Sequence, residues 1–283
     1  MSDFQDFLAP AKVNVFLHIT GQRVDGYHTL QSAFQLLDFY DTISLKPTSN
    51  HQIKRITQID TIPEHEDLCV RAAQELQQAA NCKQGVEIKL QKRIPMGGGL
   101  GGGSSDAATV LLALNQLWGV HFSRDALMKI GLSLGADVPF FIFGQSAWVE
   151  GIGDILTPLT LPTPYYVVLT PPIHVSTAKI FTHSGLTKDT KPLKIADFSN
   201  GANSKLFRND LEKVVCEEFT AVTSTLEWLY QHGQARMSGS GASVFVTVDS
   251  LAKAKSIFAE KPVEIQGFIA KGLSQHPLYE LAK

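Results

Sequence analysis

Alternating hydrophobic and polar residues near the start of the chain predict β-strands. Over residues 12–21, one face of the predicted strand carries Val13, Val15, Leu17 and Ile19, and the other carries Lys12, Asn14, Phe16 and His18. A second strand is predicted over residues 34–45, and Asp25 and Gly26 form the pivot of a turn between the two. Residues 48–66 are polar and weakly patterned, so hairpins or loops are expected there.

Hydrophobic residues at helical spacing begin further along. A helix is predicted over residues 67–81, where one stripe is formed by Leu68, Ala72, Leu76 and Ala79. Residues 86–90 alternate as a strand, and residues 107–118 return to helical spacing. Ser123 predicts the start of another helix and Gly135 its end.

The rest of the chain combines short strands with two helices. Strands are predicted over 139–143, 165–170, 235–248 and 263–270, and helices over 210–232 and 251–260. Strands gather near the start instead of alternating regularly with helices, which favours an α+β protein over a doubly wound sheet. Pro and Thr are frequent in residues 157–164, so we expect two domains, 1–156 and 157–283.

Composition narrows the class of protein. The 283 residues are 44% hydrophobic and 18% charged, which is enough to bury a substantial core. The net charge of −2 does not resemble the basic footprint of a nucleic-acid binder. Cys69, Cys82 and Cys216 are widely separated and odd in number, which favours free thiols in a reducing compartment.

Targeting signals are also not evident. The first residues carry acid where a signal peptide carries base, and the apolar run 138–143 is too short to span a bilayer. We therefore expect a cytoplasmic protein that binds neither nucleic acid nor membrane and has no obligate protein partner.

A glycine-rich run lies between a predicted strand and a predicted helix. It comprises Pro95, Met96, Gly97, Gly98, Gly99, Leu100, Gly101, Gly102, Gly103, Ser104 and Ser105. Glycine lacks Cβ and tolerates positive φ, so several backbone N–H groups can converge on one anion. The dipole of the helix that follows also favours phosphate, and Lys89, Lys92 and Arg93 lie just upstream. The run therefore predicts a phosphate-binding loop.

Other interpretations of the run are weaker. A flexible linker is disfavoured because a strand and a helix bracket the run closely. The pattern G-x-G-x-x-G is satisfied, but any glycine-rich run satisfies it easily, and no strand ending in an acid follows about 20 residues on, as a dinucleotide fold requires. Gly98 and Gly103 have the spacing of a Walker A loop, but Ser104 stands where that motif requires lysine.

The run resembles the ATP loop of the GHMP kinases, which include galactokinase, homoserine kinase and mevalonate kinase. Three further blocks match in the same order: residues 10–17 with 25–30, residues 135–139, and residues 238–242. Together the blocks span nearly the whole chain, and they are most similar to kinases of a cytidine-diphosphate-linked polyol in the non-mevalonate route to isoprenoid precursors. The resemblance implies a two-domain α+β fold, with an ATP-binding N-terminal domain and the active site in the cleft between the domains.

Lys12 and Asp137 match the catalytic lysine and aspartate of that family. Without the resemblance, each would be read as an ordinary residue, on a strand end and in a turn. With it, Asp137 would accept the proton that the substrate hydroxyl loses as it attacks the γ-phosphorus, and Lys12 would keep the carboxylate ionised. ATP with Mg²⁺ is the expected cofactor. The sequence has no dedicated metal cluster, and Ser105 is a weak candidate ligand.

The resemblance also implies a site for the acceptor substrate. Its expected residues are Asn14, Tyr27, His28, Thr177, Phe181, Gly239 and Ser240. Tyr27 and His28 would hold cytosine by stacking and by hydrogen bonds. Phe181 is either a second stacking ring or a core side chain, and Gly239 lies either over the phosphates or in a tight hairpin turn.

On the nucleotide side, Lys92 matches the family and Asp67 departs from it. The family commonly has an asparagine at the position of Asp67, and that asparagine contacts adenine. A carboxylate accepts a hydrogen bond from the adenine amino group but cannot donate to a ring nitrogen.

Two other functions stay open at this point. A homoserine or mevalonate-type kinase is disfavoured, because those substrates carry no base for Tyr27 and His28 to hold. A catalytically silent nucleotide sensor on the same fold is disfavoured, because both Lys12 and Asp137 are present.

Overall fold

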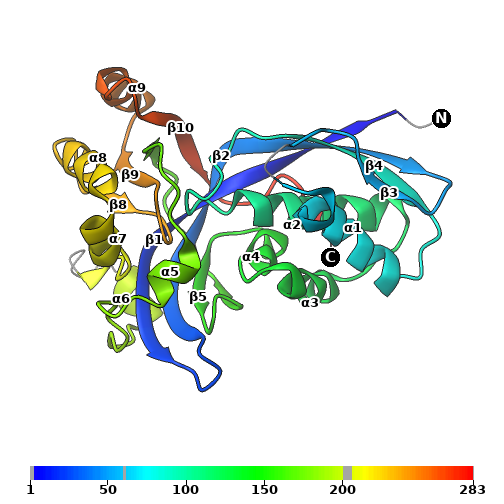
Figure 1. The fold of residues 1–283 in the computed structure, drawn as a ribbon, viewed down its shortest axis with the longest axis horizontal. Helices are drawn as coiled ribbons and strands as arrows, with labels where there is room; N and C mark the ends of the chain where they lie inside the picture. The colour runs from blue at the N-terminus through cyan, green and yellow to red at the C-terminus, as the bar shows by residue number, and fades with distance from the viewer. Residues whose placement is uncertain (1–2, 60–61, 200–205, 283) are drawn as a thin grey trace.

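The computed structural model describes residues 3–59, 62–199 and 206–282, and its strands form one mixed sheet (Figure 1). The strands are β1 (Gln5–Gln22), β2 (His28–Thr48), β3 (Ile53–Arg55), β4 (Gly85–Gln91), β5 (Ala147–Glu150), β6 (Ile155–Pro158), β7 (Tyr165–Thr170), β8 (Arg236–Met237), β9 (Val244–Val248) and β10 (Gln266–Leu273). Their order is β3-β4-β2-β10-β7-β9-β8, with β1 and β5 also paired to β2, and β6 to β5. The α+β expectation is confirmed.

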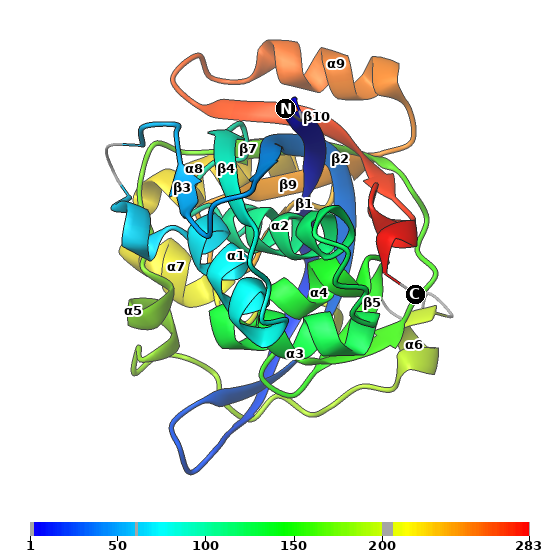
Figure 2. The same ribbon diagram turned by 90° about the vertical axis from the view of Figure 1, so that its right-hand side faces the viewer.

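Most of the helices lie in two groups. The helices are α1 (Leu68–Ala79), α2 (Gly102–Leu117), α3 (Arg124–Leu134), α4 (Val138–Phe143), α5 (Thr177–Phe181), α6 (Ile195–Ser199), α7 (Glu212–Glu218), α8 (Thr220–Tyr230) and α9 (Leu251–Glu260). Figure 2 shows α2 between the sheet and helices α1, α3 and α4. In Figure 1, α7, α8 and α9 lie at the other end of the molecule, beside β8, β9 and β10, with α5 and α6 between the two groups. No helix among the described residues is long and apolar enough to cross a membrane.

The antiparallel pair β1–β2 connects the two ends of the molecule. β2 pairs with β1 along its length, with β4 near its C-terminal end and with β10 at Leu36 and Leu37. β10 pairs in turn with β7, so the sheet is continuous from the first half of the chain to the second. The predicted division between residues 156 and 157 stays a prediction.

Helix α2 carries the glycine-rich run to the centre of the molecule. Its residues 105–115 are all buried, and its apolar side chains face the sheet on one side and the neighbouring helices on the other. A helix that is apolar all round needs such cover on every side. The residues just before α2 are therefore held rigidly, between the sheet and the helical layer.

Several predicted boundaries agree with the structure. The strand at 165–170 is β7, and the helix at 251–260 is α9. Ser123 and Ser250 cap α3 and α9 by accepting hydrogen bonds from Ala126 N and Lys253 N, both at 3.3 Å. The first two strands are longer than predicted, and the last is β10, which begins after the exposed Val263. Within 48–66 lie β3 and a short 3₁₀ turn, while residues 60–61 fall outside the described part.

The apolar run 139–143 was predicted as a strand, and this prediction is wrong. The segment is helix α4, with Pro139 in its first turn, where the missing N–H costs no internal hydrogen bond. Five apolar residues are too few for periodicity to distinguish a buried strand from a buried helix. Asp137 therefore lies at the N-terminus of a helix and not in a loop before a strand.

The single helix predicted over 210–232 is also wrong. The segment forms α7 and α8, and the backbone of Phe219 between them is extended, with φ −131° and ψ 90°. The Phe219 side chain packs against the core. The break therefore depends on tertiary packing and leaves no Gly or Pro signal in the sequence.

The predicted faces of β1 change at a bulge. Asn14 pairs with Phe34, but Phe16 pairs with Ala33, so β1 contains one extra residue between them. An extra residue reverses which face the following side chains occupy. Phe16 packs with Ala33 in a separate aromatic cluster, next to His18. Phe16 and His18 therefore do not share the face of Asn14, contrary to the prediction.

Candidate active site

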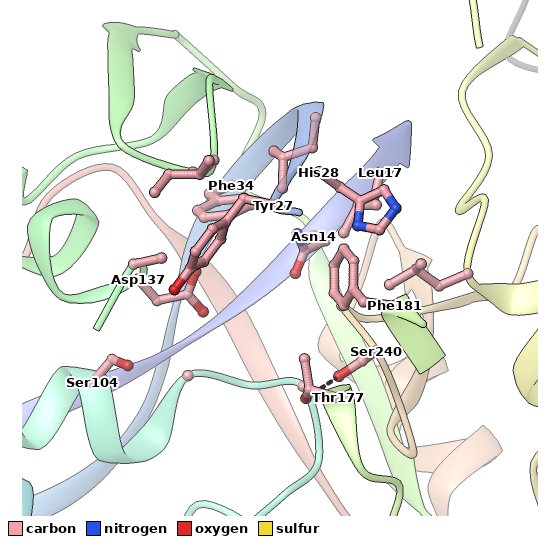
Figure 3. A pocket seen from close by; sticks show the side chains of 18 of the residues that line it. Asn14, Leu17, Tyr27, His28, Phe34, Ser104, Asp137, Thr177, Phe181 and Ser240 are labelled. Atoms are coloured by element: carbon pink, nitrogen blue, oxygen red, sulfur yellow. Dashed lines mark hydrogen bonds between the residues drawn. The ribbon is translucent and has the colours of Figure 1, made fainter. Parts of the chain in front are cut away.

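A cavity of about 700 Å³ lies where the β1–β2 pair, the glycine-rich run, the start of α4, the start of α5 and the β8–β9 connection meet (Figure 3). These segments are far apart in the sequence. The predicted site residues that line the cavity are Lys12, Asn14, Tyr27, His28, Gly97, Gly99, Gly101, Ser104, Asp137, Thr177, Phe181, Gly239 and Ser240. We call it the first cavity.

A second cavity, of about 410 Å³, lies on the other side of the glycine-rich run. Its lining includes Asp67, Lys92 and Asp106, together with residues 94–104. Alternate residues of the run, such as Gly97 and Gly99, line both cavities. The run is therefore a thin partition between two spaces. Ser105 lines neither; it is fully buried, and its hydroxyl has no partner among the described residues.

The backbone of the run is shaped to bind an anion. Gly97, Gly99 and Gly101 have φ of 68°, 73° and 71°, the left-handed region that other residues rarely adopt. A Cβ on Gly99 would lie 2.1 Å from the carbonyl oxygen of Ser238. The N–H groups of residues 99–104 donate no hydrogen bond to any described residue. These free N–H groups lie just before α2 and in its first turn, where the helix dipole also favours negative charge. Together they favour the binding of phosphate.

Lys12 and Asp137 form an ion pair in the wall of the first cavity. Lys12 Nζ lies 3.2 Å from the Asp137 carboxylate and donates to Asn14 Oδ1 at 2.7 Å. It also lies 4.4 Å from the centre of the Phe34 ring, a cation–π distance. The side chain of Lys12 is 4% exposed and that of Asp137 is 33% exposed. The lysine is thus held from behind, while the carboxylate remains accessible from the cavity.

Asn14 is oriented by its own partners. Its Nδ2 donates to Ser32 Oγ at 3.1 Å, so the amide oxygen is turned toward Lys12. The Ser32 hydroxyl donates in turn to the carbonyl oxygen of Phe16 at the bulge. The bulge therefore supports the face of β1 that carries Lys12 and Asn14.

Lys92 belongs to a buried charge cluster near the N-terminus of α2. Its Nζ pairs with Asp41 and, at 2.6 Å, with Asp106. Burial opposes the charge on Lys92, but the two carboxylates outweigh burial and raise its pKa. Burial raises the pKa of Asp106 to about 8, with Lys92 opposing the rise and Asp41 adding to it. Lys92 therefore anchors the glycine-rich run to the sheet, and its predicted contact with nucleotide stays a prediction.

Asp67 caps α1 beside the second cavity. Its Oδ1 accepts from Cys69 N at 2.7 Å, and its Oδ2 pairs with Arg55 at 2.5 Å. Asp67 is 3% exposed. Both oxygens thus have partners inside the protein, and Arg55 compensates the buried charge that an asparagine would not carry.

Aromatic rings line the end of the first cavity near the β1–β2 turn. Tyr27 is 63% exposed and follows Asp25, whose Oδ1 accepts from Tyr27 N at 3.2 Å. The rings of His28 and Phe181 are 5.6 Å apart and tilted (Figure 3). Burial, and then Lys188, lower the pKa of His28, so its imidazole is neutral near pH 7. Phe181 packs against the core and also lines the cavity, and its stacking on a base stays a prediction.

Two hydroxyl groups lie in the wall of the first cavity. Thr177 Oγ1 and Ser240 Oγ are 2.7 Å apart, which links α5 to the β8–β9 connection (Figure 3). Gly239 has φ of 55° within a turn closed by Gly241 N donating to Ser238 O at 2.9 Å. Gly239 thus lies in a hairpin turn and also lines the first cavity.

Sequence reasoning missed several residues that line the first cavity. They are Leu17, Asp25, Gly26, Leu30, Phe34, Ala136, Ile152, Gly153 and Leu211. Phe34 lies opposite Asn14 in the register of β1 with β2, which only the structure reveals. Ile152 and Gly153, at the tip of the β5–β6 hairpin, carry no signal in the sequence either, because only the fold brings that hairpin to the cavity.

Comparison with known proteins is consistent with this geometry. Residues 67–145 match the family model "GHMP kinases N terminal domain", and residues 183–260 match "GHMP kinases C terminal". A 4-diphosphocytidyl-2-C-methyl-D-erythritol kinase of Thiobacillus denitrificans is 52% identical over 276 residues, which cover 98% of each chain.

Solved structures of kinases are also similar to this chain. A crystal structure of 4-(cytidine 5′-diphospho)-2C-methyl-D-erythritol kinase is 31% identical, with a TM-score of 0.82, and the match covers 95% of this chain and 99% of that one. A homoserine kinase from Cytophaga hutchinsonii has a TM-score of 0.71 at 19% identity, covering 98% and 96% of the two chains, which shows a shared fold alone.

Proposed function

This chain belongs to the GHMP kinase family, and from that premise we propose that it transfers the γ-phosphoryl group of ATP to the 2-hydroxyl of 4-diphosphocytidyl-2-C-methyl-D-erythritol, in the non-mevalonate route to isoprenoid precursors. The chain is an ATP-dependent kinase of a small molecule. One observation carries the proposal. The Lys12–Asp137 pair and the aromatic rings line the same cavity, and the free backbone N–H groups of the glycine-rich run border it.

In this proposal each cavity holds one substrate. ATP occupies the second cavity, with its phosphates along residues 95–105 and its γ-phosphate at the partition. The cytidine group lies between Tyr27, His28 and Phe181, and the polyol extends toward Asp137. The two cavities share Gly97, Gly99, Gly101 and Ser104 in their linings, so the 2-hydroxyl can contact the γ-phosphorus directly where the cavities join, which supports direct transfer without a phosphoenzyme.

Asp137 acts as the base. Its exposed carboxylate accepts the proton of the 2-hydroxyl as that oxygen attacks the γ-phosphorus. Lys12 is fixed by Asn14 and stabilises the charge that develops on the attacking oxygen. Because phosphoryl transfer depends mainly on positioning and charge neutralisation, the rigidity of Lys12 matters as much as its charge.

Mg²⁺ fits this site as a partner of the nucleotide. No group of three His, Cys, Asp or Glu side chains in the described ranges is arranged to hold a metal ion. The hydroxyl of Ser105 is fully buried and lines neither cavity, so it does not reach a nucleotide-bound ion, whereas Ser104 lines both cavities. We infer that Mg²⁺ is bound mainly through ATP phosphates, where it neutralises their charge.

The test is to measure ADP release with purified protein, ATP and Mg²⁺. Three acceptors are compared: the cytidine-diphosphate polyol, homoserine and mevalonate. We expect turnover with the first and none with the others, and ³¹P NMR of the product should show a new phosphomonoester. Turnover with homoserine or mevalonate alone would support another kinase of this fold, and ATP binding without turnover on any acceptor would support a nucleotide sensor.

A further inference from the structure

Asn209 lies outside the first cavity, yet it touches the backbone that forms the cavity wall. It is 5% exposed and stands just before α7. Its Nδ2 donates to the carbonyl oxygens of Met237 at 2.9 Å and Gly239 at 2.7 Å. Its Oδ1 accepts from Leu211 N at 3.0 Å. The two N–H groups and the oxygen of this buried side-chain amide therefore all have hydrogen-bond partners within the fold.

The segment around Asn209 is fixed to β1 as well. Leu17 N donates to Arg208 O at 3.0 Å, and Asp210 N donates to Leu17 O at 2.8 Å. Asp210 Oδ2 also accepts from Ile19 N at 2.9 Å. Asn209 thus sits on a rigid bridge between β1 and the β8–β9 connection.

Asn209 contacts the turn formed by residues 238–241. The hydrogen bond that closes this turn does not fix the orientation of its central peptide. Gly241 N donates to Ser238 O and closes the turn, so the Gly239–Ser240 peptide is the central one. Turn types differ by a flip of this central peptide. The bond from Asn209 to Gly239 O selects one of the two orientations.

The selected orientation leaves a donor free. In a trans peptide the N–H points opposite to the C=O, so Ser240 N–H points away from Asn209. Ser240 N–H donates to no described residue, and Gly239 and Ser240 both line the first cavity. The same turn lies against the glycine-rich run, because Ser238 Oγ donates to Gly99 O at 2.9 Å.

We propose that Asn209 is a positioning residue: it holds the Gly239–Ser240 peptide so that Ser240 N–H donates to a phosphate oxygen in the first cavity. This rests on the proposed function. The oxygen belongs either to the diphosphate of the acceptor or to the γ-phosphate of ATP at the partition. Both are anionic oxygens, and a backbone N–H is a preorganised donor for such a group.

The first experiment compares Asn209→Asp with a matched control, Asn115→Asp. Asn115 is equally buried, and its amide clamps Phe122 at both N and O, but it lines neither of the two cavities. Asn209→Asp keeps the acceptor for Leu211 N and replaces the donor to Gly239 with an oxygen, which repels that carbonyl.

We expect Asn209→Asp to lower kcat/KM by about 10- to 100-fold, the range for one hydrogen bond to a charged group. The loss appears as a raised KM for the polyol if the acceptor diphosphate is the partner, and as a lower kcat if the γ-phosphate is the partner. Asn115→Asp should lower the melting temperature comparably and leave both constants near those of the wild type. Wild-type constants in Asn209→Asp, or an equal kinetic loss in Asn115→Asp, would overturn the proposal.

A second measurement uses the unmodified protein, so it does not depend on the folding of a variant. The ¹⁵N–¹H signal of Ser240 is followed while cytidine 5′-diphosphate, or separately a non-hydrolysable ATP analogue, is added. A downfield shift with one ligand supports the proposal and identifies the phosphate. A Ser240 amide that shifts with neither, in protein that turns over the polyol, overturns the proposal and leaves the proposed function intact.

Discussion

Lys12 Nζ lies 3.2 Å from the carboxylate of Asp137, and Asn14 holds the same nitrogen from the other side. The lysine is supplied by a strand and the aspartate by the N-terminus of a short helix. The pair brings a fixed cation and an accessible carboxylate to the same cavity, and the proposed chemistry depends on that arrangement.

Replacing Asp137 with asparagine should remove the proposed base without changing its shape. We expect kcat to fall by about 10²–10⁴-fold, the usual contribution of a general base. ATP affinity should change little, and the melting temperature should fall modestly, because the buried Lys12 loses its carboxylate partner but keeps Asn14. Asp125→Asn, on the exposed first turn of α3, is the control. A kcat for Asp137→Asn within a few-fold of the wild type would show that the base lies elsewhere.

Tyr27 offers a test of the acceptor class. Its ring is 63% exposed, so it is free to stack on a base that enters the cavity. Tyr27→Ala should raise KM for the cytidine substrate roughly tenfold, since stacking on one base is worth about 1–3 kcal/mol. Tyr27→Phe keeps the ring face and should retain most of the affinity. Equal KM values for the two variants would argue against stacking.

Gly99 and Gly103 form a matched pair for testing the glycine-rich run. Gly99 has φ of 73°, and a Cβ there would lie 2.1 Å from Ser238 O, whereas the nearest contact of a Cβ at Gly103 is at 3.4 Å from Leu68 Cδ1. Gly99→Ala should therefore abolish activity and destabilise the fold by about 1–3 kcal/mol or more. Gly103→Ala lies in α2 and should be neutral or slightly stabilising, by up to about 1 kcal/mol. Urea unfolding of both variants measures the difference, and equal stabilities would refute the steric argument.

His276 should make stability depend on pH. Burial, and then Arg124, lower its pKa to about 3, while an unfolded histidine has a pKa of about 6.5. The contribution of His276 is fully present above pH 6.5 and is lost as pH falls, by about 1.4 kcal/mol per pH unit, until the folded pKa is reached.

Urea unfolding at pH 7 and pH 5 measures this dependence. His276→Asn keeps an acceptor for Leu278 N, the present partner of His276 Nδ1 at 3.0 Å, and removes the titrating group. The wild type should lose about 2 kcal/mol more than the variant between the two pH values. Parallel curves for the two proteins would contradict the prediction.

Asp67 and Arg55 should behave as one unit. Their side chains are 3% and 7% exposed, so removing one charge leaves the other buried and unpaired. Asp67→Asn keeps the cap of α1 but should cost about 3–5 kcal/mol of stability, and adding Arg55→Met should restore much of it. A double-mutant cycle by chemical denaturation measures the coupling, and additive losses would mean that the pair is not coupled.

Local sequence determined much of this protein. Helices with a cap and a full apolar stripe, such as α9, were predicted at their observed bounds, because their signals lie within a few residues of one another. The glycine-rich run between a strand and a helix predicted a phosphate loop for the same reason. The proposed roles of Lys12 and Asp137 rest on resemblance to a family, since neither residue carries a local signal.

The tertiary structure decided the rest. The apolar run of α4 and the break at Phe219 depend on what packs around them, and short-range periodicity contains no information about that packing. The bulge after Asn14 reverses the face of β1, which only the register with β2 reveals. The hydrogen bond from Asn209 to Gly239 joins distant segments of the chain. Such contacts form when the whole chain folds, so the sequence predicted the chemical groups of the site, and the fold determined their positions.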